Sequence, residues 1–448
     1  MKQFRLGDIA KCCCGRLVNG DPAAEVHSVA IDDRKVQPGD LFVPIKGERF
    51  DGHEFISRAF GAGAVATLTE RELEGSQPYI LVDSTLDAFQ AIAEYYKSLF
   101  PIKTVGITGS VGKTTTKEMI WSVLSRQFRT LKSEGNLNNQ TGVPLTVMRL
   151  DNTYQAAVIE MGTNHFGEIA SLAKVVRPDF CVITNIGTAH IEHLKSRDGI
   201  LRAKTEMLAY MKEGGRVLVN GDDDKLITLK KSRRDVFTFG LENYNDLYAE
   251  DLKPQGLEGT RFTAVWQGGR EELFVPAPGT HMVYNALCAM AVGLFMGMPV
   301  SEIREGIQAY APLPGRMLLE KANGLTILND VYNANPASMK AAIDVLRYAE
   351  GRKVCILGDM LELGQDSAHF HRVVGAYAAD KGIDLILCVG SMAEEIYREA
   401  LAHGGNAFYF ADAEDDALYN LIRPGDTVLV KASRVMALER LSLIHILP

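Results

Sequence analysis

The chain has 448 residues, of which 46% are hydrophobic and 23% are charged, and its formal net charge is −8. This composition is ordinary for a soluble globular protein, and the length predicts roughly two to four domains with room for separate cores. The acidic balance argues against a nucleic-acid partner, because such a partner requires a basic stripe.

The sequence shows no secretory or membrane segment. The first ten residues carry charges where a signal peptide needs an apolar run. The longest apolar stretch, residues 286–300, is interrupted by glycines and a proline and is shorter than the roughly 18 residues of a spanning helix. The seven cysteines include no C-x-x-C pair, so we expect reduced thiols rather than a zinc site. We therefore expect a cytoplasmic protein with no membrane partner.

Residues 1–84 form the first predicted domain, a small mixed α/β unit. The turn signal Pro38-Gly39 separates its first two expected strands. In chain order, the expected elements are strands over residues 29–34 and 40–45, a helix over 54–62, a strand over 64–68 and a helix over 87–99. The last helix is ended by Pro101 and leads into the second domain.

The strongest functional signal is a glycine-rich turn between a predicted strand, residues 105–108, and a predicted helix. The turn reads Gly109-Ser110-Val111-Gly112-Lys113-Thr114. Glycines let backbone N–H groups surround phosphate oxygens, the helix N-terminus adds partial positive charge, and Lys113 supplies a mobile cation. Thr114 or Thr115 would then place a hydroxyl on a magnesium ion. The strict G-x-x-x-x-G-K-[ST] pattern has glycine where Ile107 stands, so this is a shortened variant; the alternative is a turn that binds nothing.

The second predicted domain, residues 85–314, alternates strands and helices as parallel βαβ units do, with ligands at the carboxyl ends of the strands. Beyond the glycine-rich turn, we expect strands over residues 156–160, 180–186 and 216–220 and helices over 167–176 and 284–296. Residues 235–276 are richer in polar alternation and predict small antiparallel strands. Pro312-Leu313-Pro314-Gly315 is typical of a linker.

Polar residues after two of these strands indicate a metal site. Glu160 ends an apolar strand, at the kind of position where phosphate-loop proteins carry an acid that reaches the metal. His190 follows the next strand and is a candidate for the metal shell. His193 fits an ordinary loop histidine as well as a metal ligand.

Two other stretches of the second domain leave their roles open. Asn138 and Asn139 lie in an amide-rich stretch, residues 135–144, where ligand recognition and simple turn formation are equal alternatives. Lys204 lies on a predicted helix, where lysines are usually solvated. The residues around it assign it no role.

Residues 315–448 form the third predicted domain, with apolar strands expected over 325–330, 353–357, 385–389 and 427–431. Carboxylates and amides follow two of these strands. One set is Asp330, Tyr332, Asn333 and Asn335, and the other is Asp359 and Glu362, with His369 beyond. Because such strand ends share one edge of a sheet, they predict a ligand crevice. Residues 443–448 match no element, and we interpret them as a cloning-derived tail.

In this order the motifs resemble those of the Mur ligases, the ATP-dependent amide-forming enzymes of peptidoglycan precursor synthesis. The resemblance covers nearly the whole chain, and the shortened phosphate loop is the family's own variant. Further matching motifs are Gly135–Asn139, Glu160–Gly162, Thr184–His190, Tyr332–Pro336 and Gly358–Gly364. The implied fold is α/β with three domains: a small mixed α/β N-terminal domain, a central P-loop-type parallel-sheet ATPase domain and a C-terminal Rossmann-like domain.

The resemblance also implies roles for individual residues. Lys113 would contact ATP phosphates, Thr114, Glu160 and His190 would serve the magnesium sites, and Lys204 would match a lysine that several Mur ligases carry as a carbamate. The implied nucleotide-binding residues are Gly109, Ser110, Gly112, Lys113, Thr114, Thr115, Asn285, Arg316 and Asp330. The implied substrate-binding residues are Asp33, Arg34, Lys46, Gly47, Asp51, His53, Asn138, Asn139, Tyr332, Asn333, Asn335, Ser433 and Arg434. Those of the first domain, from Asp33 to His53, would hold the uridine diphosphate sugar.

Two stretches depart from the family pattern. Asp32-Asp33-Arg34 stands where the family usually has Asp-Ser-Arg, so a carboxylate replaces a hydroxyl expected to face a diphosphate. Residues 431–436, Lys-Ala-Ser-Arg-Val-Met, replace a usual Lys-Gly-Ser-Arg-Gly-Met near the expected dipeptide.

The reaction implied by the resemblance is ATP-dependent ligation, with Mg²⁺, of D-alanyl-D-alanine to the terminal carboxylate of UDP-N-acetylmuramoyl-tripeptide through an acyl phosphate. We expect these small molecules as partners of a monomeric enzyme. One alternative is a Mur-type ligase for a shorter UDP-muramyl peptide. A folate ligase would not need the first domain with its Asp51-Gly52-His53 segment. A nucleotide-dependent switch or motor would hydrolyse ATP or GTP without an amine acceptor.

Overall fold

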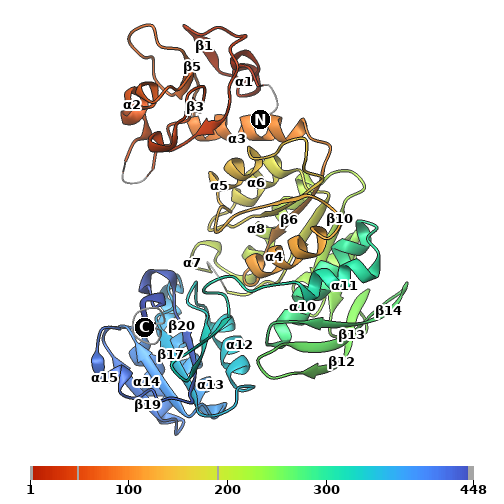
Figure 1. The fold of residues 1–448 in the computed structure, drawn as a ribbon, viewed down its shortest axis with the longest axis vertical. Helices are drawn as coiled ribbons and strands as arrows, with labels where there is room; N and C mark the ends of the chain where they lie inside the picture. Colours follow the sequence, from red (N-terminus) through yellow and green to blue (C-terminus); the bar gives the residue numbers. More distant parts are fainter. Residues whose placement is uncertain (1–3, 48–49, 189–190, 442–448) are drawn as a thin grey trace. The chain divides into compact units, whose positions relative to one another are not determined.

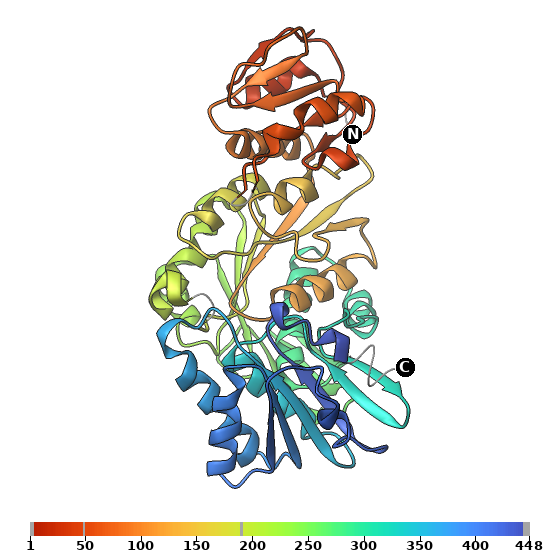
Figure 2. The same ribbon diagram turned by 90° about the vertical axis from the view of Figure 1, so that its left-hand side faces the viewer.

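The computed structural model describes residues 4–47, 50–188 and 191–441, and Figures 1 and 2 show its ribbon from two sides. The chain forms two compact units. The first consists of Met1–Thr108, Phe128–Val182 and Ala203–Val217, and the second of Gly109–Gln127, Ile183–Arg202 and Leu218–Pro448. No helix in the described part of the chain has the length and apolar content that a membrane crossing requires. The expected tail, residues 443–448, lies outside the described residues.

The N-terminal part of the first unit is a five-stranded sheet with the strand order β1-β5-β4-β3-β2. β1 is antiparallel to β5 and the other pairs are parallel, so the predicted mixed α/β unit is confirmed. Its strands are β1 (Arg16–Val18), β2 (Val29–Ala30), β3 (Leu41–Phe42), β4 (Ala66–Thr69) and β5 (Tyr79–Leu81). Its helices are α1 (Leu6–Cys12), η1 (Asp33–Lys35), η2 (Gly52–Phe55), α2 (Ile56–Gly61) and α3 (Thr85–Ser98).

Side-chain caps explain where this part departs from the prediction. The strand expected over residues 29–34 stops at Ala30, because the Asp32 carboxylate accepts the Arg34 N–H and starts the 3-10 helix η1. The strand expected over residues 40–45 pairs only at Leu41 and Phe42. Helix α3 starts two residues earlier than predicted, because the Ser84 hydroxyl accepts the Asp87 N–H.

A nine-stranded sheet in the middle of the chain has the strand order β14-β13-β12-β11-β10-β9-β6-β8-β7. Pairing of β8 with β6 and with β7 is parallel, as predicted, and every residue of β8 is buried. The strands are β6 (Lys103–Thr108), β7 (Thr130–Lys132), β8 (Ala156–Glu160), β9 (Phe180–Ile183) and β10 (Arg216–Asn220). The helices in this region are α4 (Lys113–Leu124), α5 (Gly142–Val147), α6 (Glu168–Val176), α7 (Ile191–Leu194), α8 (Arg197–Thr205), α9 (Leu229–Ser232), α10 (Thr280–Phe295) and α11 (Val300–Gln308).

Residues 235–276 add four further strands to this sheet, namely β11 (Val236–Gly240), β12 (Leu247–Pro254), β13 (Thr260–Trp266) and β14 (Gly269–Val275). The predicted antiparallel pairing is confirmed for β12 with β13 and for β13 with β14. It is wrong for β11 and β12, which are parallel. The loop between these two strands is held by Asp222, whose carboxylate accepts from the Leu241 N–H and the Asn245 amide, and so returns the chain in the same direction.

The C-terminal part of the second unit is a six-stranded sheet with the strand order β15-β16-β20-β17-β18-β19. All pairs are parallel except β15 with β16, which confirms the doubly wound prediction. The strands are β15 (Leu318–Ala322), β16 (Leu325–Asn329), β17 (Lys353–Gly358), β18 (Leu385–Val389), β19 (Ala407–Phe410) and β20 (Thr427–Lys431). The helices are α12 (Pro336–Leu346), α13 (Ser367–Asp380), α14 (Ala393–Ala402) and α15 (Asp416–Tyr419).

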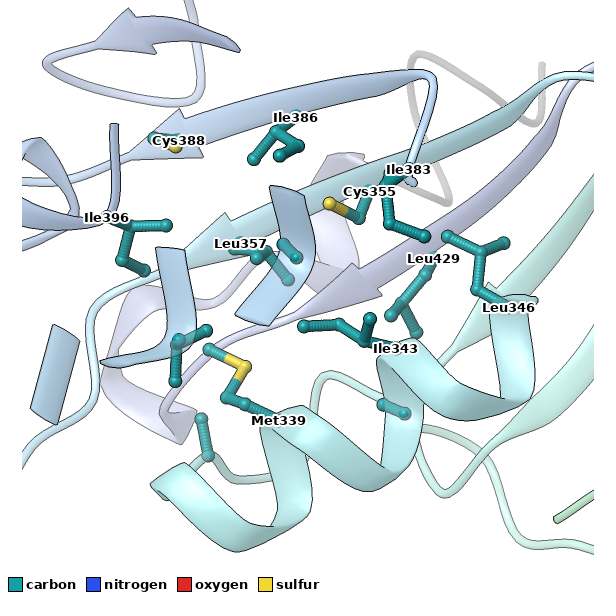
Figure 3. Close-up of a cluster of buried hydrophobic side chains, with 14 of the residues drawn as sticks. Met339, Ile343, Leu346, Cys355, Leu357, Ile383, Ile386, Cys388, Ile396 and Leu429 are labelled. Atoms are coloured by element: carbon teal, nitrogen blue, oxygen red, sulfur yellow. The ribbon is translucent and has the colours of Figure 1, made fainter. Parts of the chain in front are cut away.

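Helix α12 shows how the sequence builds this C-terminal core. Asn335 and Ser338 form a capping box at its start, and Pro336 occupies its first turn. Met339 and Ile343 are one helical turn apart and point toward the sheet, where they face strand residues such as Leu357 (Figure 3). Each such side chain contributes roughly 1.5–3 kcal/mol by its burial. The core therefore fixes the strand ends that carry the polar residues described below.

Candidate nucleotide-binding and ligase site

The glycine-rich turn connects β6 to α4 with a backbone that requires glycine. Gly109 has φ +153° and Gly112 has φ +82°, in the left-handed region. A Cβ atom at Gly109 would overlap the Thr184 hydroxyl. Lys113 begins α4 and its Nζ donates to the Gly109 carbonyl oxygen at 2.8 Å, so the ammonium group lies across the loop. This arrangement of glycines, helix N-terminus and lysine fits a phosphate group.

The segment after β9 supports this loop. Asn185 accepts the Ser110 N–H through its carbonyl oxygen and the Val111 N–H through Oδ1. The Thr184 hydroxyl donates to the Val111 carbonyl oxygen at 2.7 Å, and Ser110 Oγ accepts the Gly187 N–H at 2.9 Å. The strand predicted over residues 180–186 therefore ends at Ile183, because the next residues bond to the loop instead of a neighbouring strand. Sequence reasoning assigned this segment to the metal and missed its role in shaping the loop.

Two predicted nucleotide-binding residues contact the first turn of α4. Arg316 Nη2 donates to Thr114 Oγ1 at 3.0 Å, and the Thr116 hydroxyl donates to Asn285 Oδ1 at 2.9 Å. Tyr310, which was not predicted from the sequence, forms a hydrogen bond with Thr115 on the same turn. The pKa of the Tyr310 phenol is raised, mainly by burial and to a smaller extent by the negative charge of the nearby Glu118. Residues far apart in the sequence thus meet at the helix start.

The loop after β16 carries a further group of predicted residues. The Arg316 guanidinium stacks on the Tyr332 ring at 3.6 Å from its centroid, and that of Arg434 lies 5.9 Å from the same ring. Asp330 forms an ion pair with Lys431, whose Nζ also donates to the Asn333 carbonyl oxygen at 2.8 Å. The Lys431 side chain is only 2% exposed, so this lysine organises the loop rather than meeting solvent.

Asn335 and Ser433, two of the predicted substrate residues, both make structural contacts. Asn335 is the N-cap of α12. Ser433 is buried, and its Oγ accepts the Leu361 N–H at 2.9 Å. His369 is exposed, whereas His371 is buried and its Nε2 accepts the Met360 N–H at 2.9 Å. The role of His369 at a ligand crevice stays a prediction, whereas the structural contact of His371 was not predicted from the sequence.

In the first unit, Glu160 lies at the end of β8 and is 1% exposed. Asn138 donates to Glu160 Oε1 at 2.8 Å, and the Glu160 N–H donates to Ser133 Oγ at 3.1 Å. Asn139 accepts the Gly142 N–H at 2.8 Å, close to the start of α5. Asn139 therefore makes the contact of a turn residue and Asn138 contacts a carboxylate, while ligand recognition by either asparagine stays a prediction. Lys204 is 2% exposed, so it is not the solvated lysine typical of a helix surface.

The predicted metal ligands have the chemistry of a magnesium site. Thr114 and Glu160 offer oxygen donors, and Mg²⁺ completes its shell with water and phosphate oxygens. The third candidate, His190, lies outside the described residues, and His193 is exposed. No group of three or more His, Cys, Asp and Glu side chains among the described residues could hold a metal ion. The Thr114 hydroxyl and the Glu160 carboxylate are each a type of donor that suits a hard cation.

In the N-terminal sheet, the residues expected to hold a UDP-sugar form two groups. Lys46 and Asp51 pair through an isolated antiparallel β-bridge. The Asp51 carboxylate accepts both the N–H and the Nδ1–H of His53, and these bonds hold the pKa of Asp51 below its usual value. His53 is buried, and its Nε2 accepts the Glu70 N–H. Gly47 closes the same hairpin through a bond from its N–H to the Phe50 carbonyl oxygen.

The second group lies on η1. Asp33 pairs with Arg58 at 2.9 Å, so the carboxylate that replaces the family's serine is neutralised within the domain. Arg34 forms a bidentate contact with Asp32, and this contact lowers the pKa of Asp32 to about 2.

Comparisons with known proteins decide the family. Three models match the chain in order: "Mur ligase family, catalytic domain" over residues 25–97, "Mur ligase middle domain" over 107–293 and "Mur ligase, glutamate ligase domain" over 315–434. The UDP-N-acetylmuramoyl-tripeptide–D-alanyl-D-alanine ligase of Bacillus subtilis is 39% identical over 447 residues, with 97% of this chain and 96% of the relative covered. The chain belongs to the Mur ligase family.

Other Mur ligases agree with this result. The ligase of the same name from Escherichia coli is 37% identical over 421 residues, with 92% of each chain covered. Among solved structures, MurF from Acinetobacter baumannii has a TM-score of 0.93 at 32% identity, and the match covers 99% of this chain and 98% of the MurF chain. MurF ligase from Thermotoga maritima in complex with ADP has a TM-score of 0.83 at 28% identity, with 93% and 96% covered. As a Mur ligase, this protein is an ATP-dependent, ADP-forming amide ligase with the three-domain α/β fold of the family.

Proposed function

We propose that this Mur ligase joins D-alanyl-D-alanine to the terminal carboxylate of UDP-N-acetylmuramoyl-tripeptide and converts ATP to ADP and phosphate. The observation that carries the proposal is the full-length match to ligases of that name, at 39% and 37% identity. The glycine-rich turn with Lys113 across it supports the ATP half of the reaction. The polar loops after β16 and β17 support a second ligand at the edge of the C-terminal sheet.

In the proposed reaction, a carboxylate oxygen of the tripeptide attacks the γ-phosphorus of ATP, ADP leaves and an acyl phosphate forms. The amine of the dipeptide then attacks the acyl carbon. The bond between the acyl carbon and the phosphate oxygen breaks, phosphate leaves, and the amide forms as the nitrogen loses a proton. Lys113 and the loop N–H groups stabilise the charge on the transferring phosphoryl group. Arg316, stacked on Tyr332 and bonded to Thr114, is placed to bring a second cation to the nucleotide.

We propose Mg²⁺ as the metal, held by the Thr114 hydroxyl and the Glu160 carboxylate, with His190 as a further ligand. The ion would neutralise negative charge on the phosphoryl oxygens. Asn138, bonded to Glu160 Oε1, orients that carboxylate. For Lys204, which is buried, we propose the carbamate that the family resemblance implies. Carbamylation converts a cation into an anion, and an anion suits a site that binds metal.

We propose that each of the three predicted domains binds one ligand. Residues 1–84 bind the UDP-sugar, residues 85–314 bind ATP and residues 315–448 bind the dipeptide. The sugar-side contacts come from the η1 pair Asp33-Arg34 and from the hairpin that carries Lys46, Gly47, Asp51 and His53. The dipeptide-side contacts come from Tyr332, Asn333 and Arg434. We further propose that the enzyme acts as a monomer in the cytoplasm.

The test is phosphate release across a panel of UDP-muramyl peptides and D-amino dipeptides, with the ligated product identified by mass spectrometry. The proposal predicts release only when a UDP-muramyl tripeptide and D-alanyl-D-alanine are both present. Release with a dipeptide or monopeptide substrate and a single amino acid would instead assign the protein to another Mur ligase step. Release without any amine acceptor would point to a nucleotide switch.

A further inference from the structure

The loop that follows β17 presents one large apolar side chain to solvent. Leu361 is 41% exposed, whereas its neighbours Met360 and Leu363 are buried. A single exposed leucine is ordinary on a protein surface, and Leu401 on α14 is one at 44% exposure. Leu361 differs from Leu401 in how its backbone is held and in what lies beside it.

Hydrogen bonds of Asp359 and His371 hold this loop. The Asp359 carboxylate accepts the Met392 and Ala393 N–H groups at 3.0 and 2.8 Å at the start of α14. The buried His371 accepts the Met360 N–H through Nε2, and its Nδ1 donates to the Ser367 carbonyl oxygen at 2.7 Å. The loop is thus fixed immediately before Leu361.

Ser433, from the end of β20, holds Leu361 itself. Its N–H donates to the Asp359 carbonyl oxygen at 3.0 Å, and its Oγ accepts the Leu361 N–H at 2.9 Å. The next residue of the loop, Glu362, has φ +61°, a left-handed conformation that costs a non-glycine residue energy and that occurs at functional sites. An exposed aliphatic side chain on a backbone fixed in this way is placed to contact a ligand.

The surroundings indicate which ligand this is. β17 and β20 are neighbouring parallel strands, so Leu361 and the residues after Ser433 lie at the carboxyl edge of the sheet, where α/β folds bind ligands. Arg434 directly follows Ser433; its guanidinium pairs with Glu439 at 2.8 Å, and its side chain is 61% exposed. A fixed apolar side chain, bonded through its backbone to the residue before a half-exposed arginine, complements a short apolar peptide with a free carboxylate. D-Alanyl-D-alanine, with two methyl groups and a terminal carboxylate, has this chemistry.

We propose that Leu361 determines specificity for the acceptor by contacting a methyl group of the dipeptide, and that Ser433 is the positioning residue that holds it. The inference rests on the proposed function. It also changes the predicted role of Ser433: the hydroxyl acts on the acceptor through Leu361 rather than by direct contact. Arg434 keeps the predicted direct role.

The test compares kcat/KM for D-alanyl-D-alanine and glycylglycine, which lacks both methyl groups, in wild-type enzyme, Leu361→Ala and Leu361→Met. Loss of one methyl contact lowers kcat/KM by about 10–200-fold. We expect Leu361→Ala to show this loss for D-alanyl-D-alanine and little loss for glycylglycine, with KM for ATP unchanged. Leu361→Met, which conserves volume, should stay close to wild type. Leu401→Ala is the matched control and should leave both acceptors unchanged.

Ser433→Ala should lower kcat/KM for D-alanyl-D-alanine in the same direction, and Ser433→Thr, which keeps the hydroxyl, should restore it. The inference is overturned if Leu361→Ala retains the wild-type preference between the two acceptors, or if it lowers both equally. If the wild-type enzyme itself ligates neither dipeptide, the proposed function fails instead, so the two failures are distinguishable.

Discussion

Replacing Lys97 with methionine should stabilise the protein, because this lysine is buried at a cost. Lys97 lies on α3 and is 4% exposed. Burial, and then the nearby Lys212, lower its pKa from 10.5 to about 8, while Asp179 partly opposes them. A tenfold change in proton affinity equals about 1.4 kcal/mol, so the charged amine costs the fold about 3 kcal/mol at neutral pH.

The direction of the pH dependence follows from the proton affinity of Lys97, which is lower in the folded state than in the unfolded state. Below pH 8 the lysine is charged in both states and the full cost applies. Between pH 8 and 10.5 the folded protein loses the proton first, so the cost falls as pH rises. Lys97→Met keeps the aliphatic contacts and removes the charge. We expect it to be about 3 kcal/mol more stable than wild type at pH 7 and only about 1 kcal/mol more stable at pH 10.

The assay is urea-induced unfolding of both proteins at 25 °C, pH 7 and pH 10, followed by circular dichroism. Lys35→Met is the matched control, because Lys35 is exposed on η1, and it should change the free energy of unfolding by less than about 0.5 kcal/mol. A variant that is no more stable than wild type at pH 7 would refute the reasoning. So would a gain in stability that is equally large at pH 10.

Three further perturbations test other parts of the structure. Lys113→Ala should abolish ligation and leave the circular dichroism spectrum intact; ADP formation that still depended on both substrates would exclude the proposed role of this lysine. Gly109→Ala should weaken binding of a fluorescent ADP analogue by about tenfold or more, equivalent to about 1.4 kcal/mol, because a Cβ atom there overlaps Thr184; wild-type affinity would contradict the account. Asp179→Asn should destabilise the fold by about 3 kcal/mol at pH 7, where its ion pairs with Lys103 and Lys212 are intact. Burial alone would raise the pKa of Asp179, but its contacts with the Thr104 N–H and the lysines outweigh burial and lower it, so the difference from wild type in urea unfolding should be constant above pH 4 and shrink as pH falls below the usual 3.8. A stability difference between wild type and Asp179→Asn that grew on acidification would contradict the lowered pKa of Asp179.

Much of the fold was predictable because its signals are local. β8 and β10 have the predicted bounds, since each is a short apolar run between turn residues. The doubly wound C-terminal sheet follows from its four apolar segments. Short strands such as β7 and β19 were missed, because three or four residues give no periodicity that a sequence could show.

The site was predictable where a motif fixes the backbone and unpredictable where tertiary contacts assign the role. The glycines and Lys113 form a cradle because that turn needs positive φ values. Lys431 could not be assigned from the sequence, because its contact with Asp330 depends on β20 lying beside β16. That His371 is buried and His369 is exposed likewise depends on which face of α13 packs inward.

Transfer of ¹⁸O from substrate to phosphate tests the central claim most directly. UDP-N-acetylmuramoyl-tripeptide labelled in its terminal carboxylate is incubated with ATP, Mg²⁺, D-alanyl-D-alanine and the enzyme, and the released phosphate is analysed by mass spectrometry. Activation of the carboxylate as an acyl phosphate predicts one ¹⁸O atom in each phosphate released, in step with amide formation. Unlabelled phosphate, from attack of water on ATP, would contradict the account.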